Sequence, residues 1–190
     1  MSAASKTLAT AETLLALGDE PFEVIGGELV RRADPSAEHG DAQGSLVASI
    51  RSRFHRGSGG PEGPGGWWIL PEVDVELARH EIVRPDLGGW RRDRVPERPT
   101  GRPIRHRPDW MCEVLSAINA RNDLVWKLDL YRRVEILHYW IVDPQTETLT
   151  VHRLTPDGYL IALRADRSAT VRAEPFEAIE LRVGALFGDE

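Results

Sequence analysis

The sequence predicts an α/β fold with a single domain, in which a mixed β-sheet forms the core and helices flank it. Short hydrophobic runs rich in β-branched and aromatic residues are bounded by Pro, Gly and Asn, which is typical of β-strands. Segments with apolar residues at i, i+3, i+4 and i+7 separate these runs and indicate helices. The resulting order is helix, strands, helix, strands, helix, strands, without an internal repeat across 190 residues. Such an order fits one layered core.

The N-terminal elements are short. Within a helical segment at residues 1–20, residues 7–17 have the pattern of an amphipathic helix that Gly18 ends. Its expected inward positions are Leu8, Ala11, Leu14 and Leu15. Residues 22–31 have the pattern of two strands joined by a Gly26-Gly27 hairpin turn.

A second helix is expected over residues 36–56, with Ser36 as its N-cap. Its apolar stripe consists of Leu46, Val47, Ile50 and Phe54. Extending the stripe backwards at the same spacing reaches Gln43 and His39. Both polar side chains therefore face the interior near the helix start.

The middle of the chain is expected to alternate between strands and loops. Strands are predicted at 67–70, 73–77, 81–90 and 109–116. Glu72, Asp74 and Glu76 share one strand face, which we interpret as a solvated face in preference to a metal site. Residues 91–108 form an extended, mobile loop rich in Arg and Pro, with seven arginines against Asp93 and Glu97.

The last third is expected to begin with a helix that Asn119 or Asn122 caps and that ends near Arg133. An antiparallel meander follows, with strands at 137–142, 148–154 and 159–164. The remaining tail, up to residue 187, is expected to cover one edge of the sheet.

Composition narrows the class of protein. The chain is 41% hydrophobic and 28% charged, and no apolar run approaches the roughly 20 residues of a membrane span. The N-terminus lacks the cationic start and apolar core of a signal peptide, and the single cysteine, Cys112, excludes an intrachain disulfide framework. We therefore expect a cytoplasmic protein without a membrane partner. The net charge of −6 argues against a general nucleic-acid coat but allows a local basic path.

Three charged residues lie on faces that should be buried. Glu113 shares a strand face with Met111 and Leu115, because side chains alternate along a strand. Asp86 lies inside a run that otherwise has strand character. Lys127 belongs to the helical stripe with Leu124, Leu128 and Tyr131. Burying such charges is costly unless they are paired or bind a metal, so the pattern indicates one polar site inside the core.

An ordered series of short motifs resembles a family of small bacterial proteins described as "putative restriction endonucleases", which belong to the PD-(D/E)xK nuclease superfamily. The series covers nearly the whole chain and consists of Phe22-Glu23-Val24-Ile25-Gly26-Gly27-Glu28-Leu29-Val30, Ser36 to His39, Arg84-Pro85-Asp86, Glu113-Val114-Leu115-Ser116, Lys127 with Tyr131, Glu135, and Tyr139-Trp140-Ile141-Val142-Asp143-Pro144.

The resemblance implies a restriction-endonuclease-like core and phosphodiester hydrolysis that depends on Mg²⁺ or Mn²⁺. It gives Asp86 and Glu113 the role of metal ligands. The superfamily lysine stands two residues after the acid, where this chain has Leu115. In the family the amine comes from the following helix, which points to Lys127. The implied substrate is nucleic acid, with DNA expected.

The residues themselves fit this chemistry and leave alternatives open. Mg²⁺ prefers carboxylate oxygens, and an ammonium group can stabilise charge developing on a phosphate. His39 is a candidate to bind phosphate or shuttle a proton, or it hydrogen-bonds the sheet at a helix start. Lys127 is either an active-site amine or one partner of a buried ion pair. The corresponding alternative for the whole protein is a non-catalytic binding or assembly module that keeps the nuclease fold.

The sequence also supports two predictions about binding partners, a nucleic acid and a second copy of the chain. In the 91–108 loop, Arg102, Arg105 and Arg107 are candidates to contact nucleic-acid phosphates, with a solvated loop as the alternative. A homodimer is expected, because pairing two sites is a common way to cut both strands. Its apolar surface is expected on the meander, at Leu137, Tyr139, Trp140 and Ile141.

Overall fold

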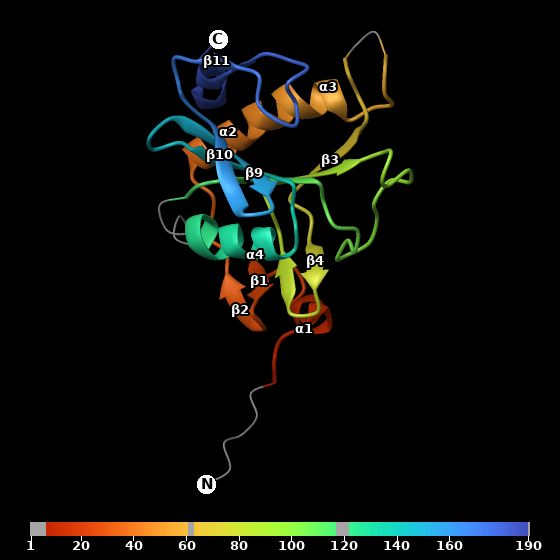
Figure 1. The fold of residues 1–190 in the computed structure, drawn as a ribbon. Helices are drawn as coiled ribbons and strands as arrows, with labels where there is room; N and C mark the ends of the chain where they lie inside the picture. Colours follow the sequence, from red (N-terminus) through yellow and green to blue (C-terminus); the bar gives the residue numbers. More distant parts are fainter. Residues whose placement is uncertain (1–6, 61–62, 117–121, 190) are drawn as a thin grey trace.

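The computed structural model of the protein describes residues 7–60, 63–116 and 122–189. A six-stranded sheet crosses the middle of the molecule, with α2 and the C-terminal tail on one side and α4 on the other (Figure 1). A four-stranded sheet lies beyond α4, and α1 lies next to it (Figure 1). The predicted mixed α/β architecture is confirmed, although its strands are divided between two main sheets.

The larger sheet has the strand order β10-β9-β8-β7-β6-β3. Its strands are β3 (Trp67–Pro71), β6 (Leu87–Arg91), β7 (Trp110–Val114), β8 (His138–Asp143), β9 (Thr148–Thr155) and β10 (Gly158–Asp166). β7 pairs with β8 in parallel, whereas the other neighbours pair antiparallel. A parallel pair needs a crossover, and here it contains η2 (Asn122–Lys127) and α4 (Leu128–Arg133). The predicted meander and helix end are confirmed; Asn119 lies outside the described residues.

β7 is one of the two central strands of the larger sheet, and all five of its residues are buried. Trp110, Cys112 and Val114 pack in the core cluster that includes α2, while Met111 packs with α4 on the opposite face. This alternation agrees with the sequence prediction. It places Glu113 on the α4 face of the sheet and Cys112 in the core, where burial raises the pKa of its thiol.

The smaller sheet has the order β2-β1-β5-β4. Its strands are β1 (Phe22–Ile25), β2 (Glu28–Arg31), β4 (Val75–Ala78) and β5 (Glu81–Val83). The β1–β2 hairpin turns at Gly26 and Gly27, whose φ angles of +59° and +77° suit a two-residue turn that favours glycine. The predicted hairpin is therefore confirmed, and its outer strand ends directly before Arg32.

The prediction of one continuous strand over residues 81–90 is wrong. β5 ends at Val83 in the smaller sheet, and β6 begins at Leu87 in the larger one. Pro85 explains the break, because it has no backbone N–H to donate to a strand ladder. The chain crosses between the sheets at Arg84-Pro85-Asp86, so Asp86 lies at a junction and not inside a strand.

The first two helices agree in part with expectation. The helix predicted at 36–56 is continuous through α2 (Ala37–Leu46), the π-helical turn η1 (Val47–Arg51) and α3 (Ser52–Phe54). The Ser36 side chain accepts a hydrogen bond from the His39 backbone N–H at 3.3 Å, which confirms the N-cap. The N-terminal helix is shorter than predicted, since α1 spans Ala11–Ala16. Leu8 and Leu15 are exposed and not inward.

The C-terminal tail packs on a face of the larger sheet, which corrects the prediction that it covers an edge. It contains β11 (Thr170–Val171), β12 (Leu181–Arg182) and the 3₁₀ turn η3 (Val183–Phe187). Phe176 packs against Trp67, Trp110 and Trp140 with ring centroids 4.8 to 5.6 Å apart. The tail and α2 thereby bury the same face.

The Arg- and Pro-rich segment at 91–108 is extended, as predicted, but it is anchored at several points. Ile104 is buried and forms a β-bridge with Val75, and the Trp68 indole N–H donates to the Val95 carbonyl at 3.0 Å. These contacts count against the expected mobile loop. Within the described ranges, no helix is long and apolar enough to span a membrane.

Candidate active site

A cavity of about 240 Å³ opens where the smaller sheet, the larger sheet and the start of α2 meet. The end of β2, the kink after β3, the Pro85 junction, the end of β7 and the crossover helix all contribute to its wall. The lining residues are Pro21, Glu23, Arg32, Ala33, Asp34, Pro35, His39, Glu72, Asp86, Glu113, Val114, Ser116 and Lys127. Asp86, Glu113, Lys127 and His39, the four site residues predicted for catalysis, therefore lie around one cavity.

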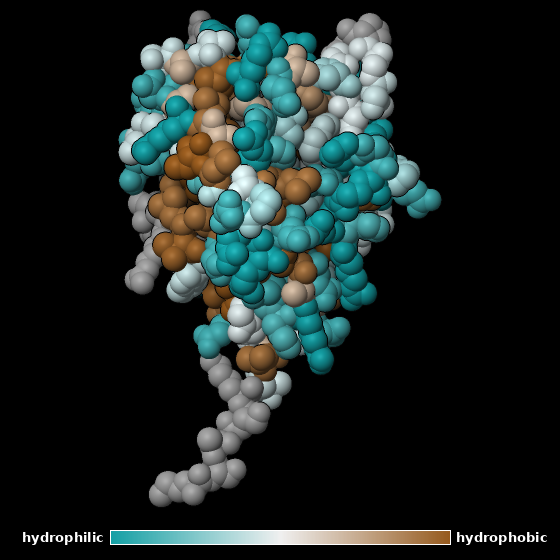
Figure 2. All heavy atoms as spheres, viewed as in Figure 1, coloured by the Kyte–Doolittle hydropathy of each residue, from teal (hydrophilic) through white to brown (hydrophobic). Residues whose placement is uncertain are grey.

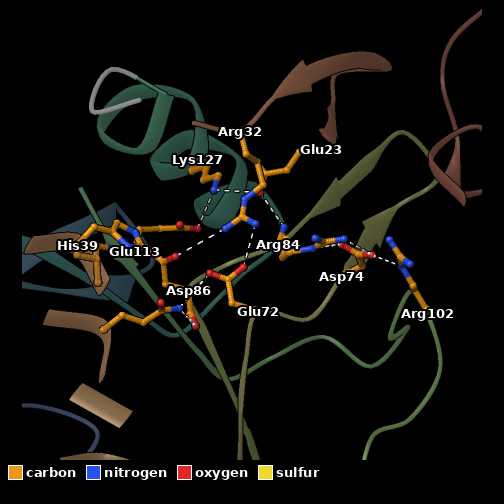
Figure 3. Close-up of polar contacts among 12 residues, drawn as sticks. Glu23, Arg32, His39, Glu72, Asp74, Arg84, Asp86, Arg102, Glu113 and Lys127 are labelled. Carbon is orange, nitrogen blue, oxygen red and sulfur yellow. Dashed lines mark hydrogen bonds and ion pairs between the residues drawn. The ribbon is translucent and has the colours of Figure 1, made fainter. Parts of the chain in front are cut away.

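Asp86 connects α2 to the end of β7. Its carboxylate Oδ2 accepts a hydrogen bond from the Val114 backbone N–H at 2.6 Å and lies 3.2 Å from His39 Nε2 (Figure 3). Because β6 begins only at Leu87, the carboxylate takes the place of a ladder partner for Val114. Burial alone would raise the pKa of Asp86, but the hydrogen bonds from His39 and Val114 lower it. The pKa of His39 is raised by the same Asp86 contact.

Glu113 and Lys127 form a buried ionic cluster with Glu23. Lys127 Nζ lies 2.9 Å from Glu113 Oε1 and 3.1 Å from Glu23 Oε1, and all three side chains are almost fully buried (Figure 3). The Tyr131 hydroxyl donates to the same Glu113 oxygen at 2.8 Å. One end of the Glu113 carboxylate is thus fixed by two donors from the crossover helix.

A second polar group surrounds Arg32, which follows β2 directly. Arg32 NH1 lies 2.9 Å from Glu72 Oε2, and its NH2 lies 3.7 Å from Asp86 Oδ1. The Gln43 amide donates to Glu72 Oε1 at 3.0 Å and to the Asp86 backbone carbonyl at 3.2 Å. The predicted inward direction of Gln43 is confirmed. These contacts join α2, β2 and the β3–β4 kink at the cavity wall.

The donors of the cavity suit a hard divalent cation that keeps water ligands. Five carboxylates line the wall (Glu23, Asp34, Glu72, Asp86 and Glu113), against two strongly basic side chains, Arg32 and Lys127. Among the described residues, no group of three or more His, Cys, Asp or Glu side chains is arranged to hold a metal. A closed protein cage of the kind used for structural metals is therefore absent from this part of the chain. Mg²⁺ commonly uses one or two protein carboxylates, and water and phosphate oxygens fill its remaining positions. The wall can provide the carboxylates.

Sequence reasoning missed several residues of the wall, among them Glu23, Arg32 and Glu72, and misassigned Asp74, a carboxylate outside the wall. Glu23 carried a signal, since it is an acid within an apolar strand, whereas Arg32 and Glu72 are brought in by tertiary contacts alone. The solvated face predicted for Glu72, Asp74 and Glu76 is wrong for Asp74. That residue is buried and paired with Arg84 and Arg102 at 2.6 and 2.7 Å. Leu124, predicted to face inward with Lys127, is 44% exposed.

The three arginines proposed to contact nucleic acid lie outside the cavity lining, and each pairs with an acid. Arg102 pairs with buried Asp74 (Figure 3) and also with Asp19. Arg105 pairs with Glu76 at 2.9 Å, and Arg107 pairs with Glu135 at 3.0 Å. Arg105 and Arg107 are the more exposed of these side chains, so their pairs are open to exchange with other anions.

Comparison with known proteins identifies relatives of this arrangement. Curated proteins gave no match. The fold is similar to a solved structure described as "a putative nuclease belonging to DUF820" from Anabaena variabilis ATCC 29413, with a TM-score of 0.72 and 21% sequence identity. The match covers 94% of this chain and 97% of that chain, which confirms the predicted restriction-endonuclease-like α/β fold. A family model described as "Uma2: Putative restriction endonuclease" matches residues 11–184. Because the matched range extends over most of the sequence, the chain belongs to the Uma2 family.

Proposed function

We propose that the protein is a metal-dependent nuclease that hydrolyses phosphodiester bonds, with DNA as its substrate. The observation that carries the proposal is the convergence of Asp86, Glu113 and Lys127 on one cavity whose wall has more carboxylates than cations. The family membership and the fold of the DUF820 protein support the reaction class.

Asp86 and Glu113 are the proposed ligands for Mg²⁺ or Mn²⁺. When bound, such a cation polarises the phosphoryl oxygen and lowers the pKa of a coordinated water. The protein side supplies the fixed orientation of the carboxylates. Val114 N–H and His39 hold Asp86, while Lys127 and the Tyr131 hydroxyl hold Glu113. Such fixed ligands lose little orientational freedom when a substrate binds.

Lys127 and His39 are the proposed partners in proton and charge handling. The Lys127 ammonium is buried at the wall, where low polarity strengthens its attraction for a phosphate oxygen that gains charge. It also orients an attacking water through its hydrogen-bonding capacity. His39 Nε2 faces Asp86, so the imidazole can keep that carboxylate in place or exchange a proton at the cavity wall.

The first test is hydrolysis by the purified wild-type chain. Supercoiled plasmid, single-stranded DNA and RNA are each incubated with Mn²⁺ or Mg²⁺, with a chelator in the control. We expect cleavage of DNA that the chelator abolishes. Asp86→Asn and Glu113→Gln should each lower the rate about 100-fold or more, since even indirect partners of a metal are worth 10- to 100-fold.

Asp109→Asn is the matched control. Asp109 is also a buried carboxylate, but it lies next to the opposite end of β7 and pairs with Arg94. This variant should keep its Mn²⁺ affinity by calorimetry. Equal Mn²⁺ affinity in wild type and Asp86→Asn would refute the ligand assignment, and cleavage that persists in chelator would refute metal dependence.

One observation favours the alternative of a non-catalytic binding or assembly protein. Lys127 bridges Glu113 and Glu23, as expected for a closed ionic cluster. Calorimetry separates the two functions, because a closed cluster should bind neither Mg²⁺ nor Mn²⁺.

A further inference from the structure

The proposed reaction leaves Arg32 without a role, although it is one of the two strongly basic side chains of the cavity wall. Its side chain is 19% exposed, compared with 4% for Lys127. Lys127 also lies between two carboxylates, Glu23 and Glu113. Arg32 is therefore the cation that an anion entering the cavity can reach first.

Glu72 holds Arg32 in this position, and Gln43 in turn holds Glu72. Glu72 contacts the guanidinium through one carboxylate oxygen and accepts from Gln43 through the other. Glu72 has a φ of +51°, a backbone conformation that residues other than glycine seldom adopt unless their surroundings hold them there. Such retained conformations cluster at functional sites. The kink after β3 thus directs a carboxylate toward Arg32 at the cost of an uncommon backbone geometry.

The guanidinium has more donors than the described residues use. It carries five N–H groups in a fixed plane, and its contacts among the described residues are Glu72 at 2.9 Å and Asp86 at 3.7 Å. Figure 3 shows the group directed between Glu72, Asp86 and Glu113. Its hydrogen bond and charge pairing with Glu72 outweigh burial and raise the pKa of Arg32, so it stays charged.

We propose that Arg32 binds a phosphate group of the nucleic-acid backbone at the cavity, and that Glu72 and Gln43 position it for this contact. The inference deepens the proposed nuclease function and rests on it. A wall with five carboxylates repels a phosphate, and a planar guanidinium at the accessible side offsets this repulsion with paired donors. The recognised class is a phosphodiester anion.

The test measures binding and not hydrolysis. A fluorescein-labelled 20-nucleotide single strand is titrated with protein in Ca²⁺ at several salt concentrations. Arg32→Ala should weaken binding about tenfold or more, as expected for loss of a charge-assisted hydrogen bond. The slope of log affinity against log salt should flatten by about 0.7 for one lost phosphate contact. Mn²⁺ affinity should stay equal or rise, because a cation next to Asp86 is gone.

Arg31→Ala is the matched control, since Arg31 is the preceding residue, is exposed and lies outside the cavity lining. It should change affinity less than twofold, within the scale of an ordinary surface substitution. Arg32→Lys keeps the charge but not the planar pair of donors, so it should keep the salt slope and lose part of the affinity. This variant decides the question if Arg32→Ala does not fold.

Any of three results would overturn the inference: oligonucleotide binding that is unchanged in Arg32→Ala, binding that is equally weakened in Arg31→Ala, or a wild type that binds no oligonucleotide. Parallel Mn²⁺ hydrolysis assays keep this failure distinct from failure of the proposed function. Cleavage together with binding that does not depend on Arg32 would support the nuclease function and refute the phosphate contact of Arg32. Binding that depends on Arg32 without any cleavage would support the phosphate contact and refute the nuclease function.

Discussion

Lys127 is the residue whose chemistry depends most on its surroundings. The chain uses arginine at 22 of its 24 basic positions but has lysine at this buried site. A compact ammonium fits between Glu113 and Glu23, at 2.9 and 3.1 Å, where a planar guanidinium needs more room. Two carboxylates around one amine also leave the cluster negative, which a bound divalent cation would compensate.

We predict that Lys127→Arg folds and binds Mn²⁺ but loses hydrolysis about 100-fold or more, the scale of removing one group that stabilises transition-state charge. Lys127→Met keeps the apolar stem and loses the same activity. Because the structure adds Glu23 to the cluster, Lys127→Met should also cost roughly 3 kcal/mol of stability in metal-free protein. Melting temperature and nuclease rate per folded molecule measure both effects.

The double variant Glu23→Gln, Lys127→Met is the control, since it removes one of the two uncompensated charges. It should recover part of the lost stability without recovering activity. Large destabilisation with full activity per folded molecule would show that Lys127 is an ion-pair partner and has no role in the reaction.

At this scale, local patterns were sufficient for some site residues and not for others. Glu113 and Lys127 follow from strand alternation and helix spacing, and His39 follows from a helix stripe read backwards. Arg32 and Glu72 could not be predicted, because their roles depend on contacts between elements that are distant along the chain. His39 and Asp86, which are 47 positions apart, meet only because α2 crosses the end of β7.

At the scale of elements, the Pro85 junction shows what a hydrophobic run does not reveal. Residues 81–90 have continuous strand character, yet they supply β5 to one sheet and β6 to the other. Pattern analysis detects that a segment prefers an extended backbone, but strand partners are set by tertiary packing. The break at Pro85 brings Asp86 to the cavity. The sequence identified Asp86 as a site residue, but it did not predict the break that positions this residue.

The 91–108 segment leads from β6, which follows Asp86, to β7, which carries Glu113, and its arginines are proposed to guide nucleic acid. Arg105 and Arg107 pair with acids at the surface, where such pairs contribute little and can exchange for phosphate. We predict that replacing Arg102, Arg105 and Arg107 by alanine flattens the salt dependence of binding. The expected change is about 0.7 to 0.9 log units per decade of salt for each lost contact.

A second triple variant provides the comparison. Arg153, Arg167 and Arg172 also pair with carboxylates, but they belong to β9 and the C-terminal tail. Their replacement by alanine should leave the slope unchanged. Since Arg102 contacts buried Asp74, Arg102→Ala is also measured alone for melting temperature. Equal slopes of log affinity against log salt in wild type and in the Arg102, Arg105, Arg107 variant would indicate that the 91–108 segment has only a structural role.

At the scale of the whole molecule, the surface expected to mediate a homodimer needs correction. Tyr139, Trp140 and Ile141 are buried within the chain and cannot offer an interface. Leu137 is 41% exposed, in agreement with the prediction, and Leu160 and Ile161 are further exposed apolar side chains of the meander. Figure 2 shows hydrophobic surface over the region where β10 and α4 lie. β10 is also an edge strand of the larger sheet, and unpaired edges favour association.

The corrected prediction is a homodimer that forms through β10. Wild-type protein at tens of micromolar should sediment at twice the chain mass of 21.3 kDa. Ile161→Asp should sediment as a monomer, because Ile161 is 58% exposed and a charge there would be buried without a partner at the interface. Leu15→Asp is the control: Leu15 is an exposed apolar residue on α1, away from β10, so this variant should remain dimeric.

If paired sites cut both strands, Ile161→Asp should nick plasmid with little linear product, whereas Leu15→Asp should linearise it as wild type does. A wild type that sediments only as a monomer would refute the homodimer, and the proposed hydrolysis would then be carried out by a single chain.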